Sequence, residues 1–208
     1  ATNVVTVAKA DPSYEIPTGL TATYGETLVD VALSDGWTWK DSGLSVGNAG
    51  TNSFTAIYDN GDANYNTAEV TVSVAVAKAD PEVPEVDTLN ATYGDDLSSV
   101  VLPAGFTWVS TGKVGNAGTN AFTAVYNNGD ANYNTAEVTV SVVVAKADPE
   151  VPEVGTLNAT YGDDLSSVVL PEGFTWKSTG SVGNAGTNEF IAIYNNGDAN
   201  YNTAEVTV

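Results

Sequence analysis

The sequence predicts an all-β protein built from three tandem copies of one small module, and three observations lead there. Short strings recur at a nearly constant interval, the string AKADP beginning at Ala8, Ala77 and Ala145. Apolar and polar residues alternate along many segments, which is the pattern of half-buried strands. Asn-Gly pairs, which favour chain reversal, follow several of these segments. Such self-similarity is typical of arrays of small domains.

Two further strings place the copies. TYG begins at Thr23, Thr92 and Thr160, and GNAGTN begins at Gly47, Gly115 and Gly183. We expect repeat 1 at 10–78, repeat 2 at 79–146 and repeat 3 at 147–208, with 1–9 the end strand of a preceding repeat or the start of the first copy. Because the chain starts with Ala1 and stops where earlier copies continue, we expect it to be a fragment of a longer protein.

Individual strands follow from the alternation. In EVTVSVVVA the four valines Val138, Val140, Val142 and Val144 share one face. The same spacing groups Leu89 with Ala91 and Tyr93, groups Phe122 with Ala124 and Tyr126, and places Phe106 and Trp108 on either side of Thr107. Each set predicts a strand with one buried face.

One segment of each copy departs from this alternation. After TYG, apolar residues recur at i, i+3 and i+4, as Leu97, Val100 and Val101 do in repeat 2. Asp95 and Asp96 precede them, and negative charge favours the start of a helix. A single helical turn and a bent strand both fit this pattern. The equivalent residues are Leu28, Val31 and Ala32 in repeat 1 and Leu165, Val168 and Val169 in repeat 3.

Composition excludes several classes of function. The chain lacks Cys, His and Arg, so it has no thiolate, no imidazole base and no guanidinium clamp for phosphate. Its formal charge of −20 disfavours nucleic acid and anionic membrane surfaces as partners. We expect no enzyme, no catalytic or metal residue and no cofactor. We expect a monomer whose partners are neighbouring repeats of the same chain.

The segments between copies carry proline instead of a flexible linker. From Ala77 the chain reads AKADPEVPEVDT, in which Pro81 and Pro84 favour extended backbone. We expect the last strand of one copy to run almost directly into the first strand of the next. The three copies would then form a stiff head-to-tail rod of roughly 100 Å.

The string FTAVYNNGDANYNTAEVTVSVVVAKA, which starts at Phe122, resembles the end of tandem bacterial immunoglobulin-like repeats. ATYGDDLSSVVLPAGFTWVS and VGNAGTN resemble the front half of the same repeats, found in surface proteins of Gram-positive bacteria. The resemblance implies three immunoglobulin-like β-sandwiches of six or seven strands each. A related repeat in which a short helix after TYG covers one sheet is the alternative. The resemblance also implies a stalk that projects an adhesive or catalytic domain from the cell wall.

The acidic loop NNGDAN is a candidate calcium site. Its carboxylates are Asp62, Asp130 and Asp198, one per copy, with Asp59 as a second acid in repeat 1 only. Calcium prefers six to eight oxygen ligands, several of them charged. A turn in which Asp and Asn bond the local backbone explains the loop with fewer assumptions.

Three lysines recur at one position, Lys9, Lys78 and Lys146. Because stalk domains of the family that the chain resembles can carry Lys–Asn isopeptide cross-links, these lysines are candidates for that bond. The alternative is an ordinary ion pair with a neighbouring acid such as Asp80.

Aromatic residues are candidates for stacking on sugars. They include Trp37, Trp39, Trp108 and Trp176. At alternating strand positions of so small a domain, such residues more often form the core. The tyrosines of the NYN strings, Tyr65, Tyr133 and Tyr201, are expected to anchor a loop, as in the tyrosine corner of immunoglobulin domains.

These features together predict a structural spacer of a secreted or cell-surface bacterial protein. The other hypothesis is a repeated binding module, an adhesin for glycan or host protein, whose affinity repetition would multiply.

Overall fold

The structure is a computed structural model that describes residues 3–208, and it confirms an all-β chain. It divides into two compact units, Ala1–Pro84 with Tyr126–Ala136 and Glu85–Val125 with Glu137–Val208. The first unit thus joins repeat 1 to one loop of repeat 2. No helix among the described residues has the length and apolar character needed to cross a membrane.

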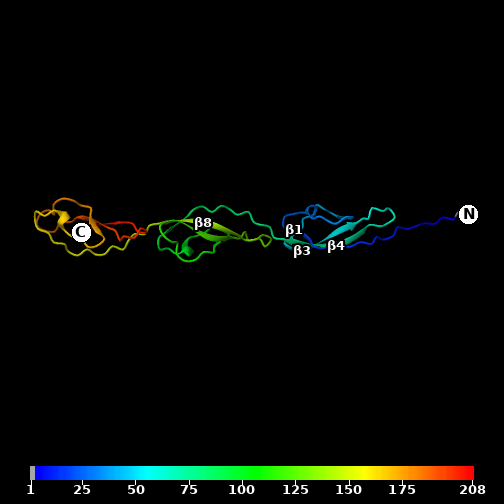
Figure 1. Cartoon of the computed structure of the whole chain (residues 1–208), viewed down its shortest axis with the longest axis horizontal. Coiled ribbons are helices and arrows are strands. Elements are labelled where there is room, and N and C mark those ends of the chain that lie inside the picture. Colours follow the sequence, from blue (N-terminus) through cyan, green and yellow to red (C-terminus); the bar gives the residue numbers. More distant parts are fainter. Residues whose placement is uncertain (1–2) are drawn as a thin grey trace. The chain divides into compact units, whose positions relative to one another are not determined.

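Repeat 1 forms a four-stranded sheet in the order β1-β4-β3-β2 (Figure 1). Its strands are β1 (Leu20–Thr23), β2 (Trp37–Trp39), β3 (Gly50–Tyr58) and β4 (Ala68–Ala77). The last strand, β4, pairs antiparallel with β3 and parallel with β1, so it is held on both sides.

The alternation of β4 explains its central place. Val72, Val74 and Val76 are buried, whereas Ser73 and Ala75 between them are exposed. Repeat 2 repeats this arrangement on β8 (Ala136–Ala145), where Val140, Val142 and Val144 are buried. The predicted valine face is therefore confirmed.

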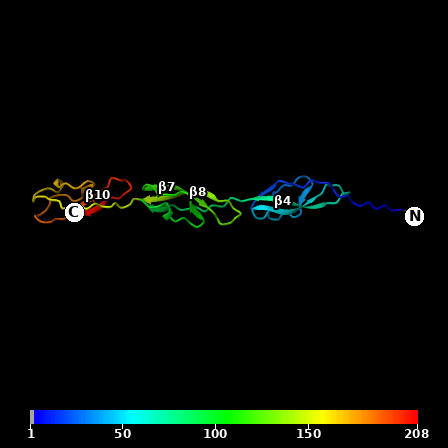
Figure 2. The ribbon, with the colours of Figure 1, turned by 90° about the horizontal axis from the view of Figure 1, so that it is seen from below.

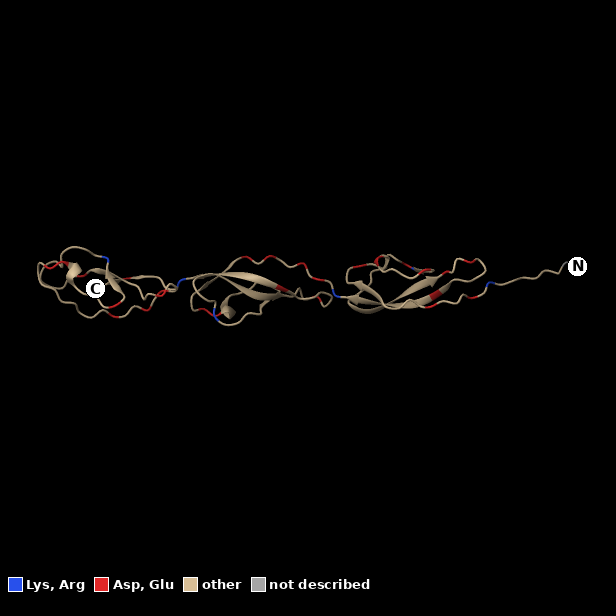
Figure 3. Ribbon diagram, viewed as in Figure 1, with Lys and Arg blue, Asp and Glu red and all other residues tan. Residues whose placement is uncertain are grey.

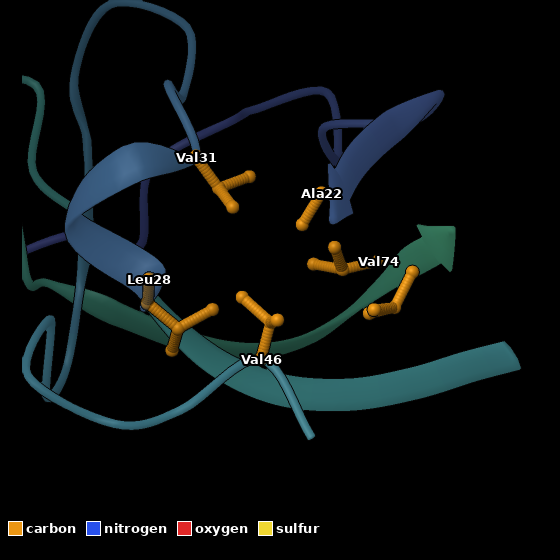
Figure 4. Close-up of a cluster of buried hydrophobic side chains, with 6 residues drawn as sticks. Ala22, Leu28, Val31, Val46 and Val74 are labelled. Atoms are coloured by element: carbon orange, nitrogen blue, oxygen red, sulfur yellow. The ribbon is translucent and has the colours of Figure 1, made fainter. Parts of the chain in front are cut away.

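The segment after TYG is a single turn of 3-10 helix, which confirms the helical alternative. In repeat 1 it is η1 (Leu28–Asp30), and Leu28 and Val31 pack with Val46, Ala22 and Val74 (Figure 4). The i+4 residue does not join this face, because Val101 is 83% exposed. A 3-10 turn has three residues per turn, so only i and i+3 lie above each other.

Repeats 2 and 3 contain the remaining elements. Repeat 2 has β5 (Leu89–Thr92), η2 (Leu97–Ser99), β6 (Phe106–Trp108), β7 (Gly118–Tyr126) and β8 in the sheet order β5-β8-β7-β6. Figure 2 labels β7 and β8, which are neighbours in this sheet. Repeat 3 has η3 (Leu165–Ser167), β9 (Phe174–Trp176), β10 (Ile191–Tyr194) and β11 (Ala204–Thr207) in the sheet order β11-β10-β9.

The strand count differs from the six or seven expected for a sandwich. In repeat 1 the four named strands form one sheet, and its buried face is covered by η1 and by the loop that carries Val46. That loop forms one isolated antiparallel β-bridge, between Ser45 and Thr27. Its residues 40–49 make turns and bends instead of a ladder, which sequence alternation alone does not distinguish from a short strand.

The path between copies also differs from the prediction. β4 ends at Ala77 and β5 starts at Leu89, and between them only Ala79 makes a β-bridge. Pro81 and Pro84 have no N–H to donate to a ladder, and the segment from Asp80 to Thr88 forms no strand.

Replacing Leu97 with Ala tests the importance of the 3-10 turn for the core. Leu97 is fully buried, so the change should lower the free energy of unfolding by about 2–5 kcal/mol. Urea denaturation followed by tryptophan fluorescence would measure it. The matched control is Val101→Ala, four positions further along the chain, which should change the free energy of unfolding by no more than about 0.5 kcal/mol. Equal losses in the two variants would contradict the described packing.

Candidate functional site

The strings common to all three copies meet where one repeat follows another. In the first unit, the loop Asp130–Asn134 of repeat 2 packs on the TYG and GNAGTN segments of repeat 1. In the second unit, the loop Asp198–Asn202 of repeat 3 packs in the same manner on repeat 2. We call each of these sites a junction.

The loop that enters the junction is shaped by its own aspartate. Oδ1 of Asp130 accepts hydrogen bonds from the backbone N–H and from the side-chain amide of Asn132, both at 2.9 Å. Because the amide nitrogen is held by the aspartate, the Oδ1 atom of Asn132 is left to face repeat 1. Asx turns of this kind are a usual local role for Asp and Asn.

The receiving loop of repeat 1 presents a backbone donor. The N–H of Ala49 donates to Oδ1 of Asn132 at 2.8 Å. The side chain of Asn52 sets the shape of this loop, because its amide donates to the carbonyls of Val46 and Asn48 at 2.8 and 2.7 Å. Gly47 has φ +80°, and a Cβ there would lie 3.0 Å from the Asn52 amide nitrogen, so glycine is required.

An aromatic pair also joins the two repeats at this junction. The rings of Tyr24 and Tyr133 meet edge to face, with centroids 5.4 Å apart and planes at 76°. Such pairs contribute about 0.5–1.5 kcal/mol beyond the area they bury. Tyr133 thus holds its loop as expected, but through the TYG tyrosine of the preceding repeat and not through a corner within its own repeat, and Tyr65 in repeat 1 is 38% exposed.

The connecting chain is fixed to the same loop. Ala79 donates its N–H to the carbonyl of Asn132 at 3.0 Å, and its carbonyl accepts from Asn134 N–H at 2.8 Å. The side-chain amide of Asn134 then donates to Asp80 at 2.7 Å. The first residues after β4 are thus bonded to the loop of the following repeat.

The second junction reproduces the first. Ala117 N–H lies 2.8 Å from Oδ1 of Asn200, and the rings of Tyr93 and Tyr201 are again 5.4 Å apart at 76°. Ala147 exchanges two backbone bonds with the loop, and Asp148 accepts from Asn202 at 2.7 Å. The same geometry therefore recurs at both junctions.

The calcium candidates have other partners. Asp62, Asp130 and Asp198 each accept the backbone N–H and side-chain amide of the Asn two residues on. The predicted turn with local Asp and Asn bonds is confirmed. Over residues 3–208, no group of three acidic side chains is placed to hold a metal ion.

The recurring lysines do not meet the requirements of an isopeptide bond. Lys9, Lys78 and Lys146 are exposed, whereas amine attack on an amide needs a buried lysine beside a buried acid. The expected ion pair of Lys78 with Asp80 is not among the ion pairs of the described residues, and Asp80 accepts a hydrogen bond from the side-chain amide of Asn134.

The tryptophans belong to the packing of each repeat. Trp37 is buried, and the indole N–H of Trp39 donates to the carbonyl of Val31 at 2.9 Å. Trp108 and Trp176 bond the equivalent carbonyls of Val100 and Val168, both at 2.8 Å. The prediction that these aromatics form core is confirmed.

Acidic residues are spread along the whole described chain, the junctions included (Figure 3). Exposed ion pairs join Lys40 to Glu69, Lys113 to Asp96 and Lys177 to Glu205. The pKa of Asp30 is lowered because the N–H and hydroxyl of Thr27 donate to it. The pKa of Asp164 is lowered by the hydroxyl and N–H of Ser166. Both acids fix the start of a 3-10 turn.

Sequence reasoning missed the residues that join the repeats. It assigned no role to Tyr24 and Ala49, and it placed Asn132 in a turn that makes only local hydrogen bonds. A usable signal was present, because TYG, GNAGTN and GDANYN are unchanged even in repeat 1, which differs from the other copies at many other positions.

Comparison with known proteins adds no assignment. The chain matches no protein-family model, and a search of curated proteins finds no match either.

Replacing Asn132 with Ala tests the first junction. The change removes the acceptor of the Ala49 N–H, so hydrogen exchange at that amide should accelerate by about 10-fold, the effect of losing roughly one hydrogen bond. NMR-detected exchange measures it, and Ala117 in the same spectrum is the internal control because Asn200 is intact. The Asn64→Ala variant, altered in the equivalent loop of repeat 1, should leave Ala49 unchanged. Unaltered exchange in Asn132→Ala would contradict the contact.

Proposed function

We propose that the chain is a structural spacer of a secreted or cell-surface bacterial protein, in which immunoglobulin-like repeats follow one another head to tail. It projects an adhesive or catalytic domain located elsewhere in the protein. The observation that carries the proposal is the identity of the two junctions, down to hydrogen-bond lengths and ring angles. A spacer needs each added repeat to contribute the same length and the same orientation.

The strength of the junction supports this role. Each junction combines several hydrogen bonds, at about 0.5–1.5 kcal/mol net apiece, with one aromatic pair of similar worth. A total of about 2–4 kcal/mol keeps the population of repeats that have lost these contacts at about 3 per cent or below. The prolines of the connecting segment restrict the same backbone.

The net negative charge of the chain is consistent with a structural spacer. At −20 for 208 residues, neighbouring stalks repel one another and stay in solution. Attachment to the cell wall would be made by other regions of the protein.

A repeated glycan-binding module is the less supported function. Stacking on sugar needs accessible aromatic faces, and Trp39, Trp108 and Trp176 are half-buried with their indole N–H groups bonded inside the repeat.

Small-angle X-ray scattering tests the spacer. The chain should give the profile of an elongated particle with a maximum dimension of about 100 Å, and removal of repeat 3 should shorten it by about one third. A variant with both Asn132→Ala and Asn200→Ala and a Gly-Ser-Gly insertion after Lys78 should become flexible. A compact particle, or identical profiles for the chain and this variant, would contradict the proposal.

A further inference from the structure

In repeats 1 and 2, the first strand and the last strand lie side by side and run in the same direction. In repeat 1, β1 pairs in parallel with β4 over four residues, from Leu20 beside Val74 to Thr23 beside Ala77. The N–H of Tyr24 extends this ladder by donating to the carbonyl of Ala77 at 2.9 Å. The chain therefore enters the ladder at one end and leaves it at the other.

Repeat 2 has the same arrangement. β5 pairs in parallel with β8, from Leu89 beside Val142 to Thr92 beside Ala145. The N–H of Tyr93 donates to the carbonyl of Ala145 at 2.8 Å. The parallel ladder between first and last strand thus recurs with the repeat.

The segment that leads into β1 is also bonded to the chain that leads into β4. Ala10 forms a parallel bridge with Tyr65 and exchanges two backbone hydrogen bonds with the residues on either side of it, at 3.0 and 2.8 Å. Ala10 and Leu20 are ten positions apart, and their partners Tyr65 and Val74 are nine positions apart. Since most of those nine positions belong to a strand, the segment before β1 has little slack, and tension applied to it reaches β1 directly.

Side chains hold β1 and β4 together as well. Ala22 of β1 is buried in one cluster with Val74 and Val76 of β4, and Leu20 packs against the same cluster. Figure 4 shows Ala22 and Val74 facing each other. A displacement of β1 along β4 would have to break the hydrogen bonds of the ladder and separate these side chains in the same step.

We propose that this ladder makes the repeats resistant to tension, so that the chain bears a pulling load in addition to setting a distance. The inference rests on the proposed function, because a spacer is pulled when the domain it projects is held. Tension draws Leu20 toward the start of the chain and Ala77 toward its end. These pulls are opposed along a parallel ladder, so they load its evenly spaced hydrogen bonds together, in shear. If the first and last strands were antiparallel, both pulls would act at one end and the bonds would open one after another.

Single-molecule pulling of the 208-residue chain at constant force tests the proposal. The chain has no cysteine, so two introduced cysteines define the points where force is applied. Thr18→Cys with Lys78→Cys loads the ladder in shear. Thr18→Cys with Ser73→Cys loads it from one end, because Ser73 adjoins the partner of Leu20. All three substituted positions are exposed, so both variants fold normally.

Repeat 1 should survive at least about 10-fold longer in shear than when loaded from one end at the same force. This is the effect of about one further hydrogen bond that must break in the same step, since forced unfolding is governed by the unfolding rate. Equal lifetimes, or a longer lifetime under loading from one end, would overturn the proposal.

Two buried valines of β4 form a matched pair of variants in the shear arrangement. Val76 is the partner of Ala22 in the ladder, whereas Val72 pairs with Phe54 of β3 and has no partner in β1. Val76→Ala should shorten the lifetime by about 10-fold, because it removes a contact that breaks at the barrier. Val72→Ala should shorten it by no more than about 3-fold. Equal shortening by the two variants would contradict a barrier located at the ladder.

The pulling experiment is independent of the scattering experiment that tests the spacer. Equal lifetimes in the two pulling directions, together with an elongated scattering profile, would remove the load-bearing role and leave the spacer. A compact particle whose repeat 1 still survives longer in shear would remove the spacer and leave the resistance of the ladder.

Discussion

Each complete repeat depends on the pairing of its last strand on both edges. In repeat 1, β4 is bonded to β3 and β1 and contributes three buried valines, so the 3-10 turn and the loop with Val46 have a surface to pack on. The same strand leads into the next repeat, where Ala79 is bonded at once to the loop that carries Asn132. Core and junction are therefore parts of one continuous backbone segment.

This dependence explains the differences between the repeats. In repeat 3, where the last strand is short, β10 has four residues while β3 and β7 have nine. Tyr161 is exposed at the same end.

The sequence predicted what depends on local pattern. The valine face of β8 and the core role of Trp39 follow from spacing and side-chain type, whereas the spacing at Leu97 fitted both a helical turn and a bent strand. It did not predict the single sheet, because an irregular loop held by one bridge at Thr27 alternates much like a strand. The junction was missed because the bond from Ala49 to Asn132 joins residues 83 positions apart, and no local pattern encodes it.

The central claim is that the loop 126–136 is bonded to repeat 1 and to the residues that follow its last strand. Residual dipolar couplings of backbone amides, fitted separately for repeat 1 and for this loop in one alignment medium, test it most directly. The account predicts that one alignment tensor, with the same magnitude and orientation, fits repeat 1 and the loop. Two tensors of clearly different magnitude would show that the loop reorients independently of repeat 1, and this result would contradict the account.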